Sequence, residues 1–448
     1  MHRAVKPLLP FAQRFSDAGF ELYLVGGAVR SVLLKKQPVD FDFATNATPR
    51  QVKDLFRRVI PTGEAHGTVT VIFRGSHYEV TTYRTETAYS DGRHPDTVTF
   101  ASSIEEDLSR RDFTVNAIAL RLPSGETKDP FSGREDLRNG IIRAIGDPAE
   151  RFAEDGLRLM RAIRFATQLD FAVDEATFEA IGAEAHRLEV IARERVRDEL
   201  QKILLSDRPS RGLSLLEETR LLDQIIPELS SSRGKSQGSD STFDLFEHSL
   251  EVVRFTPAEL DLRLAALFHD LAKAWTREES EDGRLAFPDH DKLSAEVAER
   301  RMEELRFPRK TIAAVSTLVR HHMFSYSSEQ GDASIRRMVS RLGAETIFRL
   351  ITLRRADVAG KRGRLVAVPQ MDELEDRLKR VLSQDAALSR KDLAVNGKDL
   401  MNAGIPKGPK LGLVLDELLE TVLDDPEMNS PEKLLPLGMR IYRERLEE

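Results

Sequence analysis

The stretch that decides the fold is Leu24-Val25-Gly26-Gly27-Ala28-Val29-Arg30, followed ten residues later by Asp40-Phe41-Asp42-Phe43-Ala44-Thr45. Its first part predicts a strand that enters a double-glycine turn and then opens a helix. Glycines let backbone N–H groups approach a phosphate, a helix N-terminus favours an anion, and Arg30 adds a positive charge. We therefore expect Gly26, Gly27 and Arg30 to bind a triphosphate, although a glycine pair after a strand is also a common plain turn.

The second part presents two carboxylates on one face of a predicted strand. Asp40 and Asp42 flank Phe41, so both carboxylates point to one side and the ring to the other. Neighbouring carboxylates repel each other unless a cation neutralises them, and oxygen ligands of this kind suit Mg²⁺. Glu79, in a further predicted strand, is expected to complete the site. An isolated Asp-x-Asp pair is more often a solvated strand edge, so the hypothesis depends on the glycine turn before it.

The rest of the pattern predicts an α+β fold, in which a small head with a mixed sheet is followed by helices. Strand-like segments are concentrated at 22–25, 41–44, 69–73, 78–82 and 118–122. Beyond about residue 145, apolar residues recur with helical period, for example over 153–168 and 192–205. A Ser/Gly/Lys run at 230–241 indicates an exposed linker and a domain boundary.

The bulk composition limits the classes of protein to which the chain can belong. Its 448 residues predict roughly two to four domains, and no apolar run approaches the roughly 18 residues that span a membrane. The absence of cysteine excludes disulfides, thiol catalysis and thiolate zinc sites, and the N-terminus shows no export signal. We therefore expect a cytoplasmic protein with no membrane partner. The net charge of −7 does not by itself suggest a nucleic acid partner.

Further motifs follow the first two in order along the chain. They are EVTTYR at 79–84, DGRHP at 91–95, RRDFTVNA at 110–117, EDGLR at 154–158 and RERVRDEL at 193–200. Together with GGAVR and DFDFAT, these motifs resemble those of the class II tRNA nucleotidyltransferase and bacterial poly(A) polymerase family. One departure is Ser31, where the family more often has an acidic residue.

The resemblance implies a polymerase-β-like head that adds nucleotides to the 3′ end of tRNA. Asp40 and Asp42 would hold two Mg²⁺ ions, one activating the 3′-hydroxyl and the other escorting the leaving pyrophosphate. Arg111 and Asp112 would contact the ribose and phosphates, with support from Asn116; outside this context, the first two would be a surface ion pair. The implied enzyme is a CCA tRNA nucleotidyltransferase that uses CTP and ATP.

A protein template for C and A is predicted from Glu154, Asp155, Arg158 and Arg161, which are expected on one face of one helix. Cytosine and adenine present an amino donor beside a ring-nitrogen acceptor, whereas uracil and guanine present a carbonyl beside an N–H. Asp155 only accepts and Arg158 only donates, so the pair matches C and A and rejects U and G. The resemblance assigns base recognition to the same motif, and Glu154 is expected to orient Arg158. Without that context, the four residues would be an exposed salt-bridged helix.

A polar stretch at 85–103, which contains Gly92 and Pro95, is expected to move when the enzyme switches from C to A. In the resembling family, enzymes that add only the two C residues have lost this loop, so its presence implies addition of the terminal A. The loop does not separate a complete CCA-adding enzyme from an A-only enzyme or a poly(A) polymerase.

A second constellation resembles the ligand order of the HD phosphohydrolase superfamily. Its members are His248, His269, Asp270, His290, His321 or His322, and Asp357. Imidazoles and carboxylates bind divalent transition metals that hydrolyse phosphoesters. Alternatively, the residues form a hydrogen-bonded core network in a domain that holds RNA. A metal-dependent phosphohydrolase is therefore the alternative function of a different class, and an RNA-binding scaffold is a third.

We predict four domains along the chain. They are a nucleotidyltransferase head at 1–137, a helical neck with the base-recognition helix at 138–232, an HD-type helical body at 233–365 and a helical tail at 366–448. The tRNA would lie along the helical part. Candidates for contacts with its backbone are Arg193, Arg195, Arg197, Arg336, Arg337 and Arg341, unless these belong to solvated faces. The oligomeric state stays open.

Overall fold

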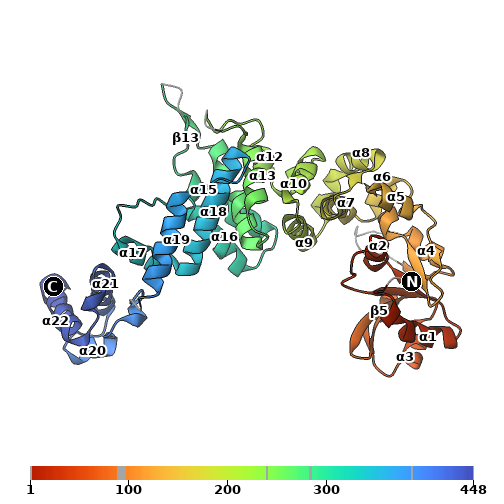
Figure 1. The fold of residues 1–448 in the computed structure, drawn as a ribbon, viewed down its shortest axis with the longest axis horizontal. Helices are drawn as coiled ribbons and strands as arrows, with labels where there is room; N and C mark the ends of the chain where they lie inside the picture. The colour runs from red at the N-terminus through yellow and green to blue at the C-terminus, as the bar shows by residue number, and fades with distance from the viewer. Residues whose placement is uncertain (1–2, 88–96, 239–240, 282–284, 385–386, 447–448) are drawn as a thin grey trace. The chain divides into compact units, whose positions relative to one another are not determined.

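The computed structural model describes residues 3–87, 97–238, 241–281, 285–384 and 387–446. The chain divides into two units: unit 1 contains Met1–Ser231 and Arg301–Pro308, and unit 2 contains Ser232–Arg300 and Arg309–Glu448. Unit 1 holds the large sheet, whereas unit 2 is mainly helical (Figure 1). The predicted α+β fold class is confirmed.

A seven-stranded mixed sheet forms the centre of unit 1, with the strand order β3-β4-β5-β2-β1-β8-β9. Its strands are β1 (Leu22–Val25), β2 (Asp42–Thr45), β3 (Val59–Gly63), β4 (Thr68–Phe73), β5 (Ser76–Thr82), β8 (Ala119–Leu122) and β9 (Thr127–Lys128). β1 is antiparallel to β2 and β8, whereas β2 and β5 are parallel. The five predicted strands correspond to β1, β2, β4, β5 and β8, because alternation and turn residues mark them in the sequence.

Successive side chains of β2 pack on opposite faces of the sheet. The ring of Phe43 lies 5.2 Å from that of Phe11 on helix α1 (Leu9–Asp17), between ring centroids. Ala44 packs on the other face, in a cluster that includes Leu108 of α4 (Ile104–Ser109). Because side chains alternate along a strand, Asp42 lies on the same face as Ala44.

Along the chain, the remaining helices of unit 1 lie between strands of the sheet or after its last strand, β9. They include α2 (Gly27–Leu33), α3 (Pro49–Leu55), α5 (Gly133–Asn139), α6 (Pro148–Glu154), α7 (Leu157–Leu169), α8 (Glu175–Ala183), α9 (Arg193–Leu204), α10 (Pro209–Glu218), α11 (Leu221–Ile225) and α12 (Pro227–Ser230). The prediction of one helix over 153–168 is wrong, because the chain is extended at Asp155, where φ is −146° and ψ is 105°. The prediction over 192–205 corresponds to α9.

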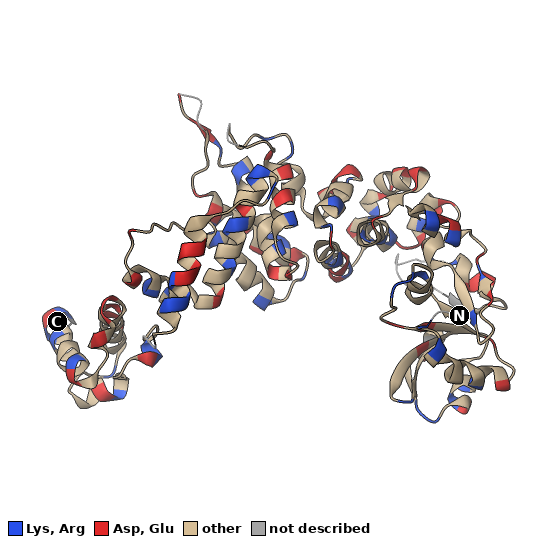
Figure 2. Cartoon of the chain, viewed as in Figure 1, with Lys and Arg blue, Asp and Glu red and all other residues tan. Residues whose placement is uncertain are grey.

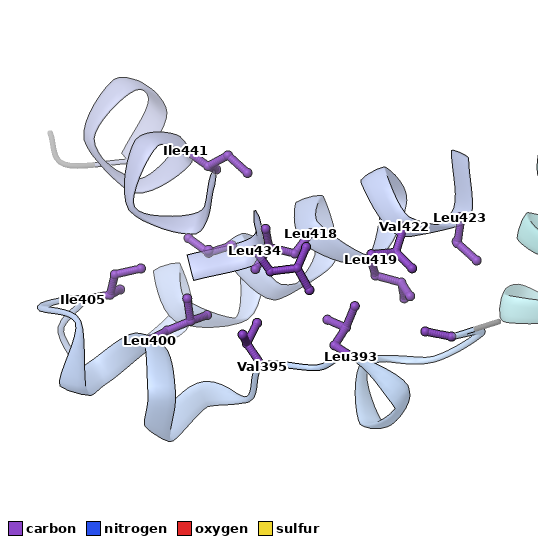
Figure 3. Packing of buried hydrophobic residues seen from close by; sticks show 12 residues of the cluster. Leu393, Val395, Leu400, Ile405, Leu418, Leu419, Val422, Leu423, Leu434 and Ile441 are labelled. Carbon is purple, nitrogen blue, oxygen red and sulfur yellow. The ribbon is translucent and has the colours of Figure 1, made fainter. Parts of the chain in front are cut away.

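Unit 2 is built from α13 (Leu245–Phe255), α14 (Leu260–Phe268), α16 (Arg309–His321), α17 (Asp332–Leu342), α18 (Ala344–Arg362), α19 (Pro369–Leu382), α20 (Gly397–Asn402), α21 (Pro409–Asp424) and α22 (Pro431–Ile441), together with most of α15 (His290–Glu304). Near the C-terminus, Leu400, Leu418 and Leu434 point into one buried cluster (Figure 3). A different cluster joins α17, α18 and α19 through Ile335, Ile351 and Leu374. The predicted boundaries at 137/138, 232/233 and 365/366 stay predictions. Within the described ranges, no helix is both long and apolar enough to cross a membrane.

Candidate active site

The glycine turn and the first carboxylates lie together where β1 ends. Gly26 has a φ of 65°, which favours glycine, and a Cβ at this position would lie 3.4 Å from a guanidinium nitrogen of Arg111. Val25 pairs with Asp42 across the antiparallel ladder of β1 and β2. Asp42 pairs in turn with Glu79 across the parallel ladder of β2 and β5. The sheet register therefore brings the glycine turn, Asp42 and Glu79 to one place, with Asp40 exposed just before β2.

The electrostatics of these carboxylates fit a bound cation. Burial raises the pKa of Asp42; Arg111 lowers it, and Asp40 raises it again. Burial also raises the pKa of Glu79, and the negative charge of Asp42 adds to that rise. A divalent cation among these oxygen ligands would remove the repulsion between them.

A cavity of 360 Å³ opens beside the glycine turn. All nine residues predicted to bind the nucleotide line it, together with four others; the full lining is Gly26, Gly27, Arg30, Asp42, Arg110, Arg111, Asp112, Asn116, Asp155, Arg158, Arg161, Phe165 and Arg195. Six of these residues are arginines and three are aspartates. The excess of positive charge suits the triphosphate of a nucleotide.

Asp112 is the centre of a buried network in this cavity. Its carboxylate accepts hydrogen bonds from Asn116 Nδ2 at 2.9 Å and from Arg161 Nε at 2.7 Å. Asn116 Oδ1 in turn accepts a hydrogen bond from Arg30. Burial raises the pKa of Asp112, but the charge of Arg161 and the hydrogen bonds from Asn116 and Arg161 outweigh it and lower the pKa to about 2. The network fixes Arg30 and Arg161 on the cavity wall.

Asp107 is a site residue that the sequence reasoning missed. It is buried on α4, where it accepts hydrogen bonds from Arg110 at 2.9 Å and from Arg111 at 3.2 Å. Burial raises the pKa of Asp107, but these two arginines outweigh the effect and lower it. Among the described residues, Arg111 Nε is buried without a hydrogen-bond partner. The available signal was an acidic residue three and four positions before the two arginines.

The residues predicted to recognise the base lie on two helices and the link between them rather than on one helix. Glu154 ends α6, whereas Arg158 and Arg161 lie on α7. A Cβ on Gly156 would lie 3.0 Å from the carbonyl oxygen of Arg187, so glycine fits the break. Arg158 pairs with Glu154 and also donates to the carbonyl oxygen of Arg110 at 3.0 Å. Arg158 is therefore held by the last residue of α6 and by the residue that follows α4.

Asp155 pairs with an arginine that the sequence reasoning assigned to RNA contacts. Arg195 Nη2 on α9 donates to Asp155 Oδ2 at 2.8 Å, and Arg195 lines the cavity. The other carboxylate oxygen accepts a hydrogen bond from the backbone N–H of Leu157 at 2.9 Å. Because the partners are 40 residues apart, no local spacing indicates this pair.

The histidines of the second constellation surround Asp270 in the core of unit 2. Asp270 Oδ2 lies 3.3 Å from His248 Nε2 and 3.1 Å from His269 Nε2, while Asp270 Oδ1 lies 3.3 Å from His290 Nε2. Among the described residues, two groups are compact enough to hold a metal ion, and both contain Asp270. They are His248, His269, Asp270 and Asp357, and Asp270, His290 and His322.

The hydrogen bonds of three histidines direct lone pairs toward Asp270. Nδ1 of His269, His290 and His322 each lies 2.7 Å from a backbone carbonyl oxygen. In a neutral ring this contact places the proton on Nδ1 and leaves Nε2 as an acceptor. An acceptor that faces a carboxylate oxygen is unfavourable unless a cation or a proton lies between them.

The prediction of His321 as a ligand is wrong. His322 lies in the cluster, with Nε2 at 3.4 Å from Asp270 Oδ1, whereas His321 is half-buried outside it. The two histidines are adjacent at the end of α16, and only the rotation of that helix decides which one faces the core.

Several arginines proposed for RNA contacts are used within the protein. Arg336 is buried and donates to the carbonyl oxygens of Leu423 at 2.6 Å and Asp424 at 2.9 Å. Arg337 pairs with Glu420 and Asp424, each at 2.7 Å. Both signs of charge are interspersed over α18 and α19 (Figure 2), where Arg355 pairs with Asp372 at 2.6 Å. The predicted backbone contacts through Arg336 are therefore wrong.

The loop predicted to move lies only partly within the described residues. Its ends form a two-stranded ribbon of β6 (Arg84–Thr87) and β7 (Thr97–Phe100). Gly92 and Pro95, and the whole motif at 91–95, lie outside the described residues.

Three family models match the chain. The "Poly A polymerase head domain" matches residues 22–143, the "Probable RNA and SrmB- binding site of polymerase A" matches 170–232, and the "tRNA nucleotidyltransferase domain 2 putative" matches 276–437. The first match contains the glycine turn and the carboxylates.

Curated relatives and a solved structure agree with these matches. The CCA-adding enzyme of Limosilactobacillus reuteri is 48% identical over 228 residues, so the match spans about half the length of each, 51% of this chain and 56% of that protein. The CCA-adding enzyme of Levilactobacillus brevis is 37% identical over 414 residues, 91% of each protein. A crystal structure of the Bacillus stearothermophilus CCA-adding enzyme in complex with CTP is 30% identical, with a TM-score of 0.75 and 100% of each chain covered.

Proposed function

The chain belongs to the family of CCA-adding enzymes, and on this premise we propose that it adds C and A from CTP and ATP to the 3′ end of tRNA, releasing pyrophosphate. The observation that carries the proposal is one cavity that joins the glycine turn, Asp42, Arg111 and the base-recognition motif. Membership of the family implies dependence on a divalent metal ion. The substrates are those of the cytoplasm, which supports a cytoplasmic location.

Each part of the cavity has a role in the proposed reaction. Two Mg²⁺ ions on Asp40 and Asp42 would activate the 3′-hydroxyl and neutralise the charge that develops on the leaving pyrophosphate. Arg30, Arg111 and Arg161 bind the triphosphate and hold it in one orientation. The carboxylate of Asp155 accepts from the amino group of the base, and the guanidinium of Arg158 donates to its ring nitrogen.

A second cavity gives the end of the tRNA a place to bind. This cavity of 590 Å³ shares Asp42 with the first, and Asp40, Val39, His77 and Glu79 also line it. The attacking hydroxyl approaches the α-phosphate from the side opposite the leaving pyrophosphate. The terminal nucleotide of the tRNA therefore belongs in the second cavity, beside Asp40 and Glu79.

The proposal is tested with tRNAs that end before CCA, after the second C, or after the complete CCA. Labelled CTP should enter the first substrate and labelled ATP the second, while the complete tRNA should accept neither. Failure to use the first substrate would leave an A-only enzyme, and long A tails would indicate a poly(A) polymerase. Asp42→Asn should abolish both incorporations, whereas Asp54→Asn, an exposed carboxylate on α3, should keep them.

We propose metal-dependent phosphoester hydrolysis as a second activity, located at the cluster around Asp270. The specific support is the set of Nε2 acceptors that face the Asp270 carboxylate. A divalent transition metal held there would activate water for attack on a phosphoester. Mn²⁺, Ni²⁺ or Co²⁺ should raise the melting temperature of the wild type and of Asp42→Asn, but not that of His290→Ala. If none of the three ions shifts the melting temperature of the wild type, the residues are a hydrogen-bonded core.

A further inference from the structure

The ring of Phe165 contacts three guanidinium groups at the edge of the nucleotide cavity. Phe165 lies on α7 and is 6% exposed. The guanidinium carbons of Arg30, Arg161 and Arg164 lie 4.8, 5.4 and 4.1 Å from its ring centroid. A cation within about 6 Å of an aromatic face is attracted by the negative charge of that face. One buried ring thus contacts three positive charges, each of which also has a polar partner: Asn116 for Arg30, Asp112 for Arg161 and Glu199 for Arg164.

Burial disfavours the charge of two of these arginines, whereas the negative charge of Asp112 raises the pKa of the third, Arg161. Burial lowers the pKa of Arg30, and the nearby charge of Arg161 lowers it further, although Asp112 raises it. Burial also lowers the pKa of Arg164 to about 10; the charge of Glu199 opposes this decrease, whereas the charges of Arg161 and Arg30 add to it. The arrangement therefore lacks part of the negative charge that a bound triphosphate would supply.

The ring is fixed by contacts that leave Arg30 and Arg161 on the cavity wall. Arg164 pairs with the buried carboxylate of Glu199 on α9 at 3.0 Å, which ties one side of the ring to a neighbouring helix. Phe113 meets the ring edge to face, with centroids 5.8 Å apart and planes at 81°. Of the three arginines, Arg30 and Arg161 line the cavity with Phe165, so they are the two available to phosphate.

We propose that Phe165 is a positioning residue, a platform that holds Arg30 and Arg161 in place for the triphosphate before a nucleotide binds. The proposal rests on the proposed function and adds a residue to it. The triphosphate is the part that CTP and ATP share, so the platform serves both nucleotides equally. Selection of the base stays with Asp155 and Arg158, which contact the other end of the nucleotide.

The test replaces the aromatic face while keeping an apolar side chain. Phe165→Leu should raise the Kd of both CTP and ATP about ten-fold in calorimetric titrations with Mg²⁺. The KM for tRNA and the ratio of C to A incorporation should stay unchanged. Phe165→Tyr restores a cation-binding face, so its Kd values should lie within about two-fold of those of the wild type.

The control separates the platform from ordinary packing. Phe152 on α6 is fully buried, and Phe152→Leu should lower the melting temperature without changing either Kd. Should Phe165→Leu fail to fold, as judged by circular dichroism, Phe165→Met supplies the same comparison with a more adaptable side chain. Unchanged Kd values in the folded variant, or a Phe165→Tyr variant as weak as Phe165→Leu, would overturn the proposal.

The binding measurement tests the role of Phe165 independently of the proposed function. If the wild type binds CTP and ATP but adds neither to tRNA, the proposed function fails, and the Kd comparison still decides the role of Phe165. A change in the preference for C over A in Phe165→Leu would instead assign the ring to base recognition, which contradicts a platform that acts on the triphosphate.

Discussion

The carboxylate of Asp155, which we propose accepts from the base, is held by Arg195 at 2.8 Å. The pair orients the carboxylate of Asp155, as an acceptor for an amino group requires. Asp155 sits in an extended link between two helices, so its side chain depends on this partner more than a residue within a helix would. On the proposed function, selectivity for C and A would therefore depend on Arg195 as well as on Asp155 and Arg158.

We predict that Arg195→Ala lowers discrimination against UTP and GTP about ten-fold, because Asp155 loses the contact that fixes its carboxylate. The measurement is the kcat/KM for each of the four nucleotides on a tRNA that ends before CCA. Arg193→Ala is the matched control, since Arg193 lies on the same helix and donates to the carbonyl oxygen of Gln224. An unchanged ratio in Arg195→Ala would show that Asp155 is held by other contacts.

Asp112 gives the site a pH dependence with a definite sign. Its pKa is about 2 in the folded protein and 3.8 in the absence of these contacts, so folding favours the ionised form. The contribution of Asp112 to the free energy of unfolding is fully present above about pH 4, and it is lost as the pH falls toward 2. Asp112→Asn should lower the melting temperature at pH 7 by an amount that corresponds to roughly 2 kcal/mol. The difference in melting temperature between Asp112→Asn and the wild type should become smaller below pH 4. A difference that does not change with pH would show that ionisation of Asp112 is not its cause.

At the scale of elements, close helix packing depends on small residues. Gly360 on α18 faces α13, where a Cβ would lie 2.5 Å from Val252 Cγ2 and 3.0 Å from its backbone nitrogen. The backbone atom cannot move without moving α13. Glycine is otherwise a poor helix residue, so its place in the nineteen-residue α18 reflects this contact.

We predict that Gly360→Ala destabilises unit 2 by about 1–3 kcal/mol, because overpacking outweighs the better helix propensity of alanine. Urea unfolding followed by circular dichroism measures the change. Gly412→Ala on α21 is the control, because its Cβ would come no closer than 3.8 Å to Arg390. That variant should be neutral or slightly more stable, and equal destabilisation of both variants would rule out the steric explanation.

At the scale of the whole molecule, the chain returns to unit 1 after it has entered unit 2. Residues 301–308 belong to unit 1, where Arg301 Nη2 pairs with Glu228 Oε1 at 2.7 Å. Glu228 is 8% exposed and Arg301 side chain 17%, so the pair is screened little by water. Unit 1 thus includes the segment 301–308, which is distant in the sequence from the rest of that unit.

We predict that Arg301→Met destabilises unit 1 by about 1–3 kcal/mol, since a buried carboxylate loses a charged hydrogen-bond donor. Differential scanning calorimetry with and without CTP identifies the transition of unit 1, because a bound ligand raises the melting temperature of the unit that binds it. Arg300→Met, on the neighbouring residue assigned to unit 2, is the comparison variant. A shift confined to the transition that CTP does not affect would contradict the prediction.

The sequence by itself determined the chemistry and the local elements. Gly26, Asp42 and Arg158 were predicted as site residues because residue type and short spacing carry the signal for a phosphate turn, a metal site and a base edge, whereas Asp112 was implied by the resemblance to the family. The strands of the sheet were predicted for the same reason, since alternation is a property of neighbouring residues.

Only the tertiary structure decided which distant residues complete each site. Strand register sets Asp42 beside Glu79, and helix packing brings Arg195 to Asp155 and Phe165 to Arg30. The extended link at Asp155 and the choice of His322 over His321 also depend on neighbours far along the chain. Such contacts depend on the packing free energy of the whole fold. The local periodicity of the sequence does not predict them.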